Sequence, residues 1–349
     1  MTITMGLGTF GDITRGADGE LLSDGQVLRD LVEQGEAADD AGVDFIGVGE
    51  HHRADFAVSS PEVVLAAIAA RTRRIRVGSA VTVLSSDDPV RVYQRFATLH
   101  GLSGGRSEVI LGRGSFTESF PLFGQDLKDY DLLFEEKLDL FVELLRNERV
   151  TWEGRTRAPL RDQGVWPRHE GEMPVWIGVG GSPDSVVRAV RHDLPMMLAI
   201  IGGDPARFAP FVDLYHRAVD KIGRQARPLG VHSHGFVAET DEAAKEAIWP
   251  HYSAMMDRIG RERGWSPMKR EGFEAEVAHG SLYVGSAETV ARRIAGTVRT
   301  LGLGRFDMKY SHGTLSHAAM MDTIRRYGEQ VVPMVRDMLS DSPARAMGA

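Results

Sequence analysis

The sequence has 349 residues, of which 42% are hydrophobic and 26% are charged, the ordinary composition of a soluble globular protein. A formal net charge of −8 and a pI near 5.9 argue against a general surface for nucleic acids or anionic membranes. The absence of cysteine excludes disulfides, a thiolate nucleophile and cysteine-ligated metal sites.

The N-terminal stretch MTITMGLGTFGD lacks the basic start and long apolar core of a signal peptide. No run of about 18 apolar residues occurs, so no transmembrane helix is predicted. We therefore expect a cytoplasmic protein.

Strand-like and helix-like segments alternate along the chain. The predicted strands span residues 3–10, 44–49, 75–84, 107–112, 174–180, 195–201, 227–239 and 305–310. The predicted helices span 27–42, 61–72, 88–103, 184–192 and 206–223, with a long helix through 134–145, one near 241–247 and a last one through 320–334. Pro61 and the pair Asp88–Pro89 are typical of helix starts.

This alternation predicts a parallel sheet, and eight strand–helix units favour a closed (β/α)8 TIM barrel, an α/β fold, over a doubly wound sheet. Such a barrel needs about 250 residues. We therefore expect one domain over residues 1–340, with insertions near 113–130, 147–173 and 248–286, and a flexible tail at 341–349. Because barrel enzymes place their chemistry at the C-terminal ends of the strands, residues there are the candidates.

The second predicted strand ends in Glu50, His51 and His52. Three interpretations fit this group: a metal site, an acid–base site, or a charged turn. His232 and His234 lie two residues apart on a later strand and therefore face the same side. Together with the first group they could bind zinc in a metal-dependent hydrolase. The last strand lacks an obvious terminal aspartate, which makes the metal interpretation the weaker one.

Two features suit an anion. Residues 178–185, GVGGSPDS, form a glycine-rich turn before a helix, where free N–H groups suit a phosphate and Ser182 can cap the helix. Arg113, between two glycines after the fourth strand, can donate charge-assisted hydrogen bonds to phosphate or carboxylate. Each also has an ordinary interpretation, as a βα turn and as a surface ion pair. Their positions on neighbouring predicted strands favour a phosphorylated ligand.

An ordered series of motifs runs from Glu50 to Asp126. They are EHH at 50–52, IRVGSA at 75–80, DDPVR at 87–91, LSGGR at 102–106, GRGSF at 112–116 and LFGQD at 122–126. The series resembles the N-terminal half of the bacterial luciferase-like flavin monooxygenases, and PVWIGVGGSPDS and YSHGTLSH resemble their second half. The resemblance covers roughly residues 1–245 and 281–335. It implies an eight-stranded barrel that binds reduced FMN. The deazaflavin F420 is the less expected cofactor.

The resemblance also implies roles for individual residues. His51 would lie beside the flavin as an acid–base group, able to move protons near neutral pH. Glu50 would help to hold the flavin, and His52 would support His51. The further flavin contacts that it implies are Ala80, Val81 and Thr82, with a cis peptide between Ala80 and Val81, then Gln94, and, at the phosphate, Arg113, Gly180, Gly181 and Ser182. The substrate pocket would include Phe10, Phe116 and His312.

Three positions depart from luciferase proper. Gly112 stands where luciferase has a reactive cysteine, Gln94 where it has a flavin-holding glutamate, and Asp131 near the position of a second phosphate-binding arginine. These departures argue against light emission and bear on how tightly flavin binds. They do not change the resemblance to the luciferase-like flavin monooxygenases.

The implied reaction is oxygenation of a small apolar aldehyde, ketone or similar substrate by O2 through a flavin C4a-hydroperoxide. A separate NAD(P)H:flavin reductase would supply reduced FMN, the insertion 248–286 could act as a lid, and the alanine-rich helix 61–72 could form a homodimer contact. The alternatives are an F420-dependent oxidoreductase, a flavin-binding paralogue without catalysis, and the metal-dependent hydrolase.

Overall fold

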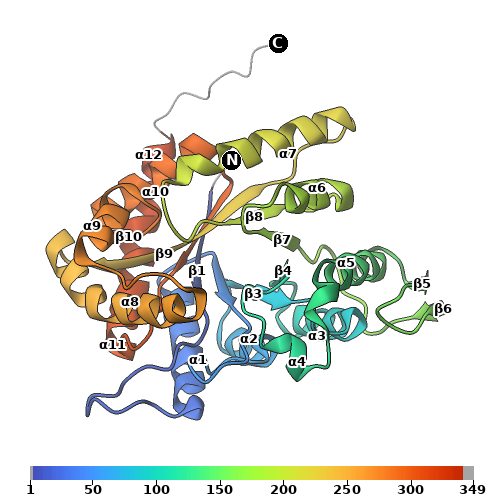
Figure 1. Ribbon diagram of the computed structural model, residues 1–349, viewed down its shortest axis with the longest axis horizontal. Coiled ribbons are helices and arrows are strands. Elements are labelled where there is room, and N and C mark those ends of the chain that lie inside the picture. Colours follow the sequence, from blue (N-terminus) through green and yellow to red (C-terminus); the bar gives the residue numbers. More distant parts are fainter. Residues whose placement is uncertain (1–2, 341–349) are drawn as a thin grey trace.

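The structure is a computed structural model that describes residues 3–340 (Figure 1). Eight parallel strands follow one another around the barrel, and pairing of β8 with β9 closes it. The barrel strands, in spatial order, are β1 (Thr4–Thr9), β2 (Phe45–Val48), β3 (Arg76–Val83), β4 (Ser107–Gly112), β7 (Val175–Val179), β8 (Met196–Ala199), β9 (Leu229–Ala238) and β11 (Arg305–Lys309). The predicted (β/α)8 barrel is confirmed; the predicted tail at 341–349 lies outside the described residues.

Helices surround the barrel (Figure 1). They are α1 (Asp24–Asp40), α2 (Pro61–Arg71), α3 (Pro89–Leu102), α4 (Ser119–Leu122), α5 (Tyr130–Arg146), α6 (Pro183–His192), α7 (Ala209–Lys221), α8 (Asp241–Arg263), α9 (Arg270–His279), α10 (Ala287–Leu301), α11 (His317–Arg326) and α12 (Val332–Ser340). Two 3₁₀ turns, Leu127–Asp129 and Pro205–Phe208, and one π turn, Tyr327–Val331, complete them. No helix in residues 3–340 is both long and apolar enough to cross a membrane.

The three segments where insertions were expected contain elements that were not predicted. Residues 113–130 contain α4 and a 3₁₀ turn, and residues 147–173 contain an antiparallel hairpin, β5 (Arg149–Trp152) with β6 (Leu160–Gly164). Within 248–286 lie the second half of α8, all of α9, and β10 (Tyr283–Ser286), which pairs with the end of β9. The helix expected near 241–247 is therefore much longer than predicted.

Glycines on inward-facing strand positions make room for large neighbours inside the barrel. A Cβ at Gly8 would lie 2.8 Å from the ring of His232, and one at Gly49 would lie 2.4 Å from the ring of Phe10. Because something must shift at such distances, the glycines fix where these two rings can lie. The C-terminal half of the barrel thus contains a few aromatic rings packed against glycine backbone.

A layer of buried charge fills the opposite, N-terminal end of the barrel. Arg305 donates to Glu108 (2.6 Å) and through two nitrogens to Asp307 (2.9 Å), and its guanidinium lies 3.9 Å from the ring centroid of Phe45. Trp176 Nε1 also donates to Glu108 (3.0 Å). Burial raises the pKa of Asp307 to about 6 in spite of Arg305. Charge at this end of the barrel serves stability, since barrel chemistry lies at the other end.

Candidate active site

His51 lies in an aromatic cage at the C-terminal mouth of the barrel. Its ring centroid is 4.7 Å from that of Phe10, 4.4 Å from that of Phe56 and 5.2 Å from that of Phe116. Burial among these rings lowers the pKa of His51 to about 3, with Lys309 acting in the same direction. The imidazole is therefore neutral near pH 7, whereas the sequence suggested a group titrating there. Phe56 was not among the predicted site residues.

Glu50 and His52 bond to each other. Glu50 Oε1 and His52 Nε2 are 2.8 Å apart, and Glu50 Oε2 accepts the Val83 N–H at 2.8 Å. The Glu50 N–H also donates to the Val81 carbonyl (3.2 Å). Glu50 thus ties the end of β2 to the end of β3. His52 contacts Glu50, and its support of His51 stays a prediction.

The peptide bond between Ala80 and Val81 is cis, as predicted. The pairing of β3 with β4 shifts register between Ala80 and Thr82, so Val81 bulges from the ladder. Its side chain fills the space beside two glycines: a Cβ on Gly112 would lie 2.6 Å from Val81, and one on Gly178 would lie 3.4 Å from it. Gly112 therefore stands at the cysteine position because Val81 takes the space of a side chain. The Thr82 hydroxyl is buried without a partner among the described residues.

The predicted phosphate features follow β4 and β7, which are paired neighbours. Gly181 has φ +104°, which favours glycine, and a Cβ on Gly180 would meet nothing within 4 Å. Ser182 is the N-cap of α6, and its side chain makes no capping hydrogen bond. Pro183 has no N–H and the Ser185 N–H donates to the Ser182 carbonyl (3.1 Å), so in the first three positions of α6 only the Asp184 N–H lacks a partner among the described residues. Arg113 donates to Asp131 (2.9 Å) and lies 5.2 Å from the Tyr130 ring centroid.

Gln94 points toward an insertion. It lies on α3, and its Nε2 donates to the Trp166 carbonyl at 2.9 Å. Trp166 belongs to the segment 147–173, so the side chain of Gln94 is engaged with that insertion. The structure shows no contact between Gln94 and the predicted catalytic group.

A buried ion pair that sequence reasoning missed lies beside the aromatic cage. Lys309, at the end of β11, is 1% exposed; its Nζ is 3.2 Å from Asp12 Oδ2 and 4.7 Å from the Phe10 ring centroid. Ser311 Oγ donates to Asp12 (2.6 Å), and so does the Gly313 N–H (3.0 Å). Burial alone would raise the pKa of Asp12, but Lys309 and these donors outweigh it and lower that pKa.

Lys309 and Asp12 shift the pKa of His51 in opposite directions, which gives a test. Replacing Lys309 with Met removes a positive charge that disfavours the imidazolium, so we expect the pKa of His51 to rise. Asp12→Asn removes a charge that favours the imidazolium and is expected to lower it. NMR titration of the imidazole should show a higher pKa for His51 in Lys309→Met than in Asp12→Asn, with both below the ordinary value of about 6.5 because the burial remains. Equal behaviour of the two variants would contradict the arrangement.

Three further histidines lie near the mouth. His312 Nε2 is 3.0 Å from the Gly235 carbonyl, which can only accept, so that nitrogen carries the proton. His234 Nδ1 then donates to His312 Nδ1 across 3.4 Å. His312, predicted in the substrate pocket, is fully buried behind this contact. The Nε2 of His232 is buried without a partner among the described residues.

These histidines do not form the zinc site that was considered. Within residues 3–340, the only three His, Asp or Glu groups whose ligand atoms lie within 4.8 Å of one another are Asp30, Glu33 and His317, on α1 and α11. His51, His52, Glu50, His232 and His234 make no such group. The metal-dependent hydrolase therefore lacks its ligand set in this fold.

The last turns of α8 are bound to the mouth. Arg53 donates to Glu262 through both terminal nitrogens, one at 2.9 Å, and Asp55 accepts from Arg53 (3.2 Å) and pairs with Arg258 (2.8 Å). Phe116 lies between two guanidiniums, with Arg53 at 4.5 Å and Arg263 at 5.3 Å from its ring centroid. Because Phe116 also contacts His51, this end of α8 covers the cage.

Weakening this contact should loosen α8 without unfolding the protein. Glu262 is half exposed, so we expect Glu262→Gln to lower the free energy of unfolding by less than about 1 kcal/mol. Amide exchange in the last turn of α8 should nevertheless quicken, since the Arg53–Glu262 pair is one of the contacts that must break for this end of α8 to open locally. Hydrogen exchange followed by mass spectrometry measures both; Glu246→Gln, which removes an exposed partner of Arg270, is the control. Unchanged exchange in Glu262→Gln would show that the ion pair does not hold α8.

The chain is similar in sequence to proteins of one family. The family model of luciferase-like monooxygenases matches residues 7–304. The chain belongs to this family. Among relatives, it is 34% identical over 209 residues to the 4-hydroxyprotoasukamycin monooxygenase of Streptomyces nodosus, covering 58% of this chain and 55% of that protein. It is 26% identical over 235 residues to the alkanal monooxygenase alpha chain of Photorhabdus luminescens, covering 65% and 62%.

Solved structures of luciferase-like proteins share the fold. The monooxygenase RslO1 of Streptomyces bottropensis superposes with a TM-score of 0.82 at 21% identity, covering 95% of this chain and 99% of that one. The oxygenating constituent of 3,6-diketocamphane monooxygenase of Pseudomonas putida, in complex with FMN, gives 0.78 at 18%, covering 95% and 98%. An F420-dependent secondary alcohol dehydrogenase gives 0.73 at 18%, covering 97% and 100%. These structures therefore show that the chain shares the fold of proteins whose structures hold FMN or F420.

Proposed function

We propose that this luciferase-like protein is a flavin-dependent monooxygenase that uses reduced FMN and O2 to oxygenate a small apolar carbonyl substrate. The observation that carries the proposal is the neutral His51 imidazole, enclosed by three phenylalanines beside the cis Ala80–Val81 bulge. Apolar walls exclude water, and a neutral imidazole can accept a proton there. Delivery of reduced FMN by a separate NAD(P)H:flavin reductase, and a homodimer, are parts of the same proposal.

The residues present fit FMN. Gly112 and Gly178 leave room for the Val81 side chain, and so accommodate the cis Ala80–Val81 bulge against which the flavin ring would lie. After β7, Gly180 has open space and the Asp184 N–H at the start of α6 has no partner among the described residues, which would suit a phosphate. Arg113 is partly exposed there and could exchange Asp131 for a phosphate.

When bound, reduced FMN supplies the activation of O2, and the protein supplies position and protection. His51 would exchange a proton at one of its ring nitrogens. Because burial keeps the imidazole neutral and disfavours its imidazolium form, His51 would hold that proton only in passing. Phe10, Phe56 and Phe116 keep water from that nitrogen. Lys309 lies against the Phe10 ring and is paired with Asp12, and these two charges determine the electrostatic potential at His51.

Anaerobic titration with FMN, reduced FMN and F420 tests the cofactor. We expect reduced FMN to bind with a Kd below roughly 100 μM, or about 5.5 kcal/mol of binding free energy. Mixing that complex with O2 and a panel of aldehydes and ketones in a stopped-flow instrument should then give substrate-dependent turnover. His51→Ala is expected to keep flavin binding and lose this turnover.

Two results would count against the proposal. Binding of F420, with oxidation of an alcohol in the absence of O2, would identify the protein as an F420-dependent dehydrogenase. Tight flavin binding with no turnover of any carbonyl would instead support the paralogue without catalysis.

A further inference from the structure

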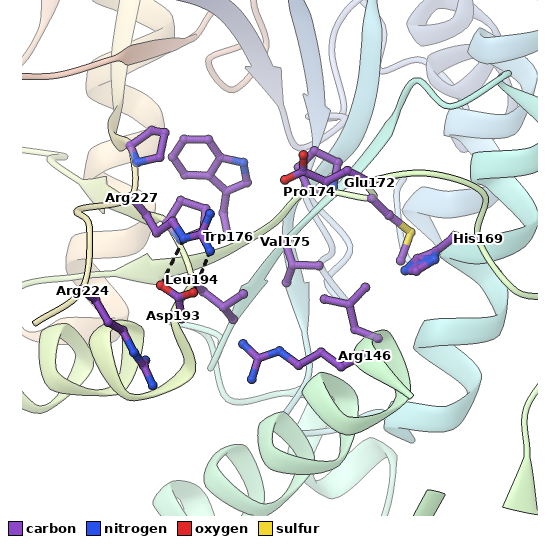
Figure 2. Close-up of a pocket in the computed structure, with 14 residues that line it drawn as sticks. Arg146, His169, Glu172, Pro174, Val175, Trp176, Asp193, Leu194, Arg224 and Arg227 are labelled. Carbon is purple, nitrogen blue, oxygen red and sulfur yellow. Dashed lines mark hydrogen bonds and ion pairs between the residues drawn. The ribbon is translucent and has the colours of Figure 1, made fainter. Parts of the chain in front are cut away.

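A cavity of about 590 Å³ opens at the end of the barrel opposite the mouth (Figure 2). It lies at the N-terminal ends of β7, β8 and β9, between the C-terminal ends of α5 and α6 and the turn after α7. Its volume falls within the roughly 300–1,000 Å³ of small-molecule sites. The proposed oxygenation uses none of its residues.

One side of the cavity is apolar. Trp176, Met173 and Leu194 line it, together with Leu145, Val175 and three prolines. Because the Trp176 N–H is already bonded to Glu108, the indole offers only carbon surface here. A flat or branched apolar group would find a matching wall.

Three arginines from two segments form the other side: Arg146 ends α5, and Arg224 and Arg227 lie between α7 and β9. Arg227 is paired with Asp193 through two bonds of 2.6 and 3.1 Å, drawn as dashed lines in Figure 2. Arg146 donates to the His192 carbonyl (2.5 Å) and Arg224 to the Val190 carbonyl (3.2 Å), so each caps the end of α6. Each cap uses one nitrogen, and no other described residue accepts from the rest of these two guanidiniums, which are exposed.

The charge balance favours a monoanion. Arg146, Arg224 and Arg227 face the carboxylates of Asp193 and Glu172, which leaves one excess positive charge, and burial lowers the pKa of His169 so that it adds none. The carbonyl end of α6 contributes a partial negative charge. A carboxylate would complete this balance, whereas a phosphate dianion would exceed it.

We propose that this cavity binds a small organic carboxylate with an aromatic or branched apolar body. The carboxylate accepts from the free N–H groups of Arg146 and Arg224, as Asp193 already accepts from Arg227. The apolar body packs on Trp176, Met173 and Leu194. This site is separate from the flavin site and does not depend on the proposed reaction.

Isothermal titration calorimetry with 2-naphthoate tests the site, with neutral 2-naphthylmethanol and 2-naphthyl phosphate as comparison probes. We expect 2-naphthoate to bind best of the three. Arg224→Gln and Arg146→Gln should each weaken it by roughly tenfold, the loss expected for one charge-assisted contact. Both arginines are exposed, so both variants should fold. Arg113→Gln, at the barrel mouth, is the matched control and should bind 2-naphthoate unchanged.

Three outcomes would overturn the proposal. The first is binding of the alcohol as tightly as the carboxylate, which would remove the role of the arginines. The second is tighter binding of the phosphate, which would contradict the charge balance. The third is loss of binding in Arg113→Gln but not in Arg224→Gln, which would place the probe at the mouth. Flavin binding by each variant is measured separately, so failure here leaves the proposed oxygenation untouched.

Discussion

The free energy of unfolding is expected to fall steeply as the pH falls from about 6.5 to about 5. Burial lowers the pKa of His51 to about 3, of His312 to about 3 and of His232 to about 4. The unfolded chain takes up a proton at each histidine near pH 6.5, while the folded protein does not. The stability that depends on their neutral form is therefore present above about pH 6.5 and is lost below it.

The size of this effect follows from proton linkage. Each histidine costs about 1.6 kcal/mol over this interval, or about 5 kcal/mol for the three. Asp307 acts in the opposite direction, because its pKa of about 6 lets the folded state gain a proton first. That offset is about 1 kcal/mol and leaves a net loss of about 4 kcal/mol, a large part of an ordinary domain's stability.

Urea unfolding at several pH values measures this slope. His232→Leu should reduce it by close to one proton, since His232 Nε2 has no partner among the described residues and its loss breaks no hydrogen bond there. Exchange of the exposed His279 for Gln should leave the slope as it is. A stability that is flat from pH 7 to about pH 5 would show that the mouth histidines are hydrated and not buried.

The barrel could be predicted because its strands are short apolar runs that end in glycine or polar residues. The hairpin of β5 and β6 was missed because it is largely exposed and so lacks an apolar run. The strand β10 was missed because it pairs with the end of β9, outside the eight barrel strands. Pro250 made a helix ending near Ala247 the natural prediction. It lies inside α8, whose buried Tyr252 and Met255 continue past it, so tertiary packing outweighs the local cost of proline.

Part of the candidate site could also be predicted. His51, Phe10 and Phe116 meet because each follows a barrel strand, and the ends of parallel strands share one face. The pair of Lys309 and Asp12 was missed because a lysine ending a strand suggests an exposed group. One signal was available: Arg305, Asp307 and Lys309 alternate along β11 and so face the same side, and that side is the barrel interior.

The buried charge layer at the N-terminal end of the barrel gives the other large effect. Arg305→Met is expected to lower the free energy of unfolding by about 3–5 kcal/mol. It leaves Asp307 buried without a counter-charge and removes one of the two arginines paired with the buried Glu108. Glu108 keeps Arg76 at 2.8 Å, while Asp307 has no other cation paired with it in the described chain. The loss should be greatest at high pH, where both carboxylates must stay ionised, and smaller near pH 5, where Asp307 can take up a proton.

Denaturant unfolding of matched variants separates the buried charge from the loss of a side chain. Arg292→Met removes a comparable arginine from an exposed i,i+4 pair with Glu288 and should cost less than about 0.5 kcal/mol. Adding Asp307→Leu and Glu108→Gln to Arg305→Met removes the stranded charges and should recover much of the loss, because an apolar set can replace a buried ionic one. If the triple variant is less stable than Arg305→Met alone, the hydrogen bonds of the layer stabilise the barrel more than its charges destabilise it.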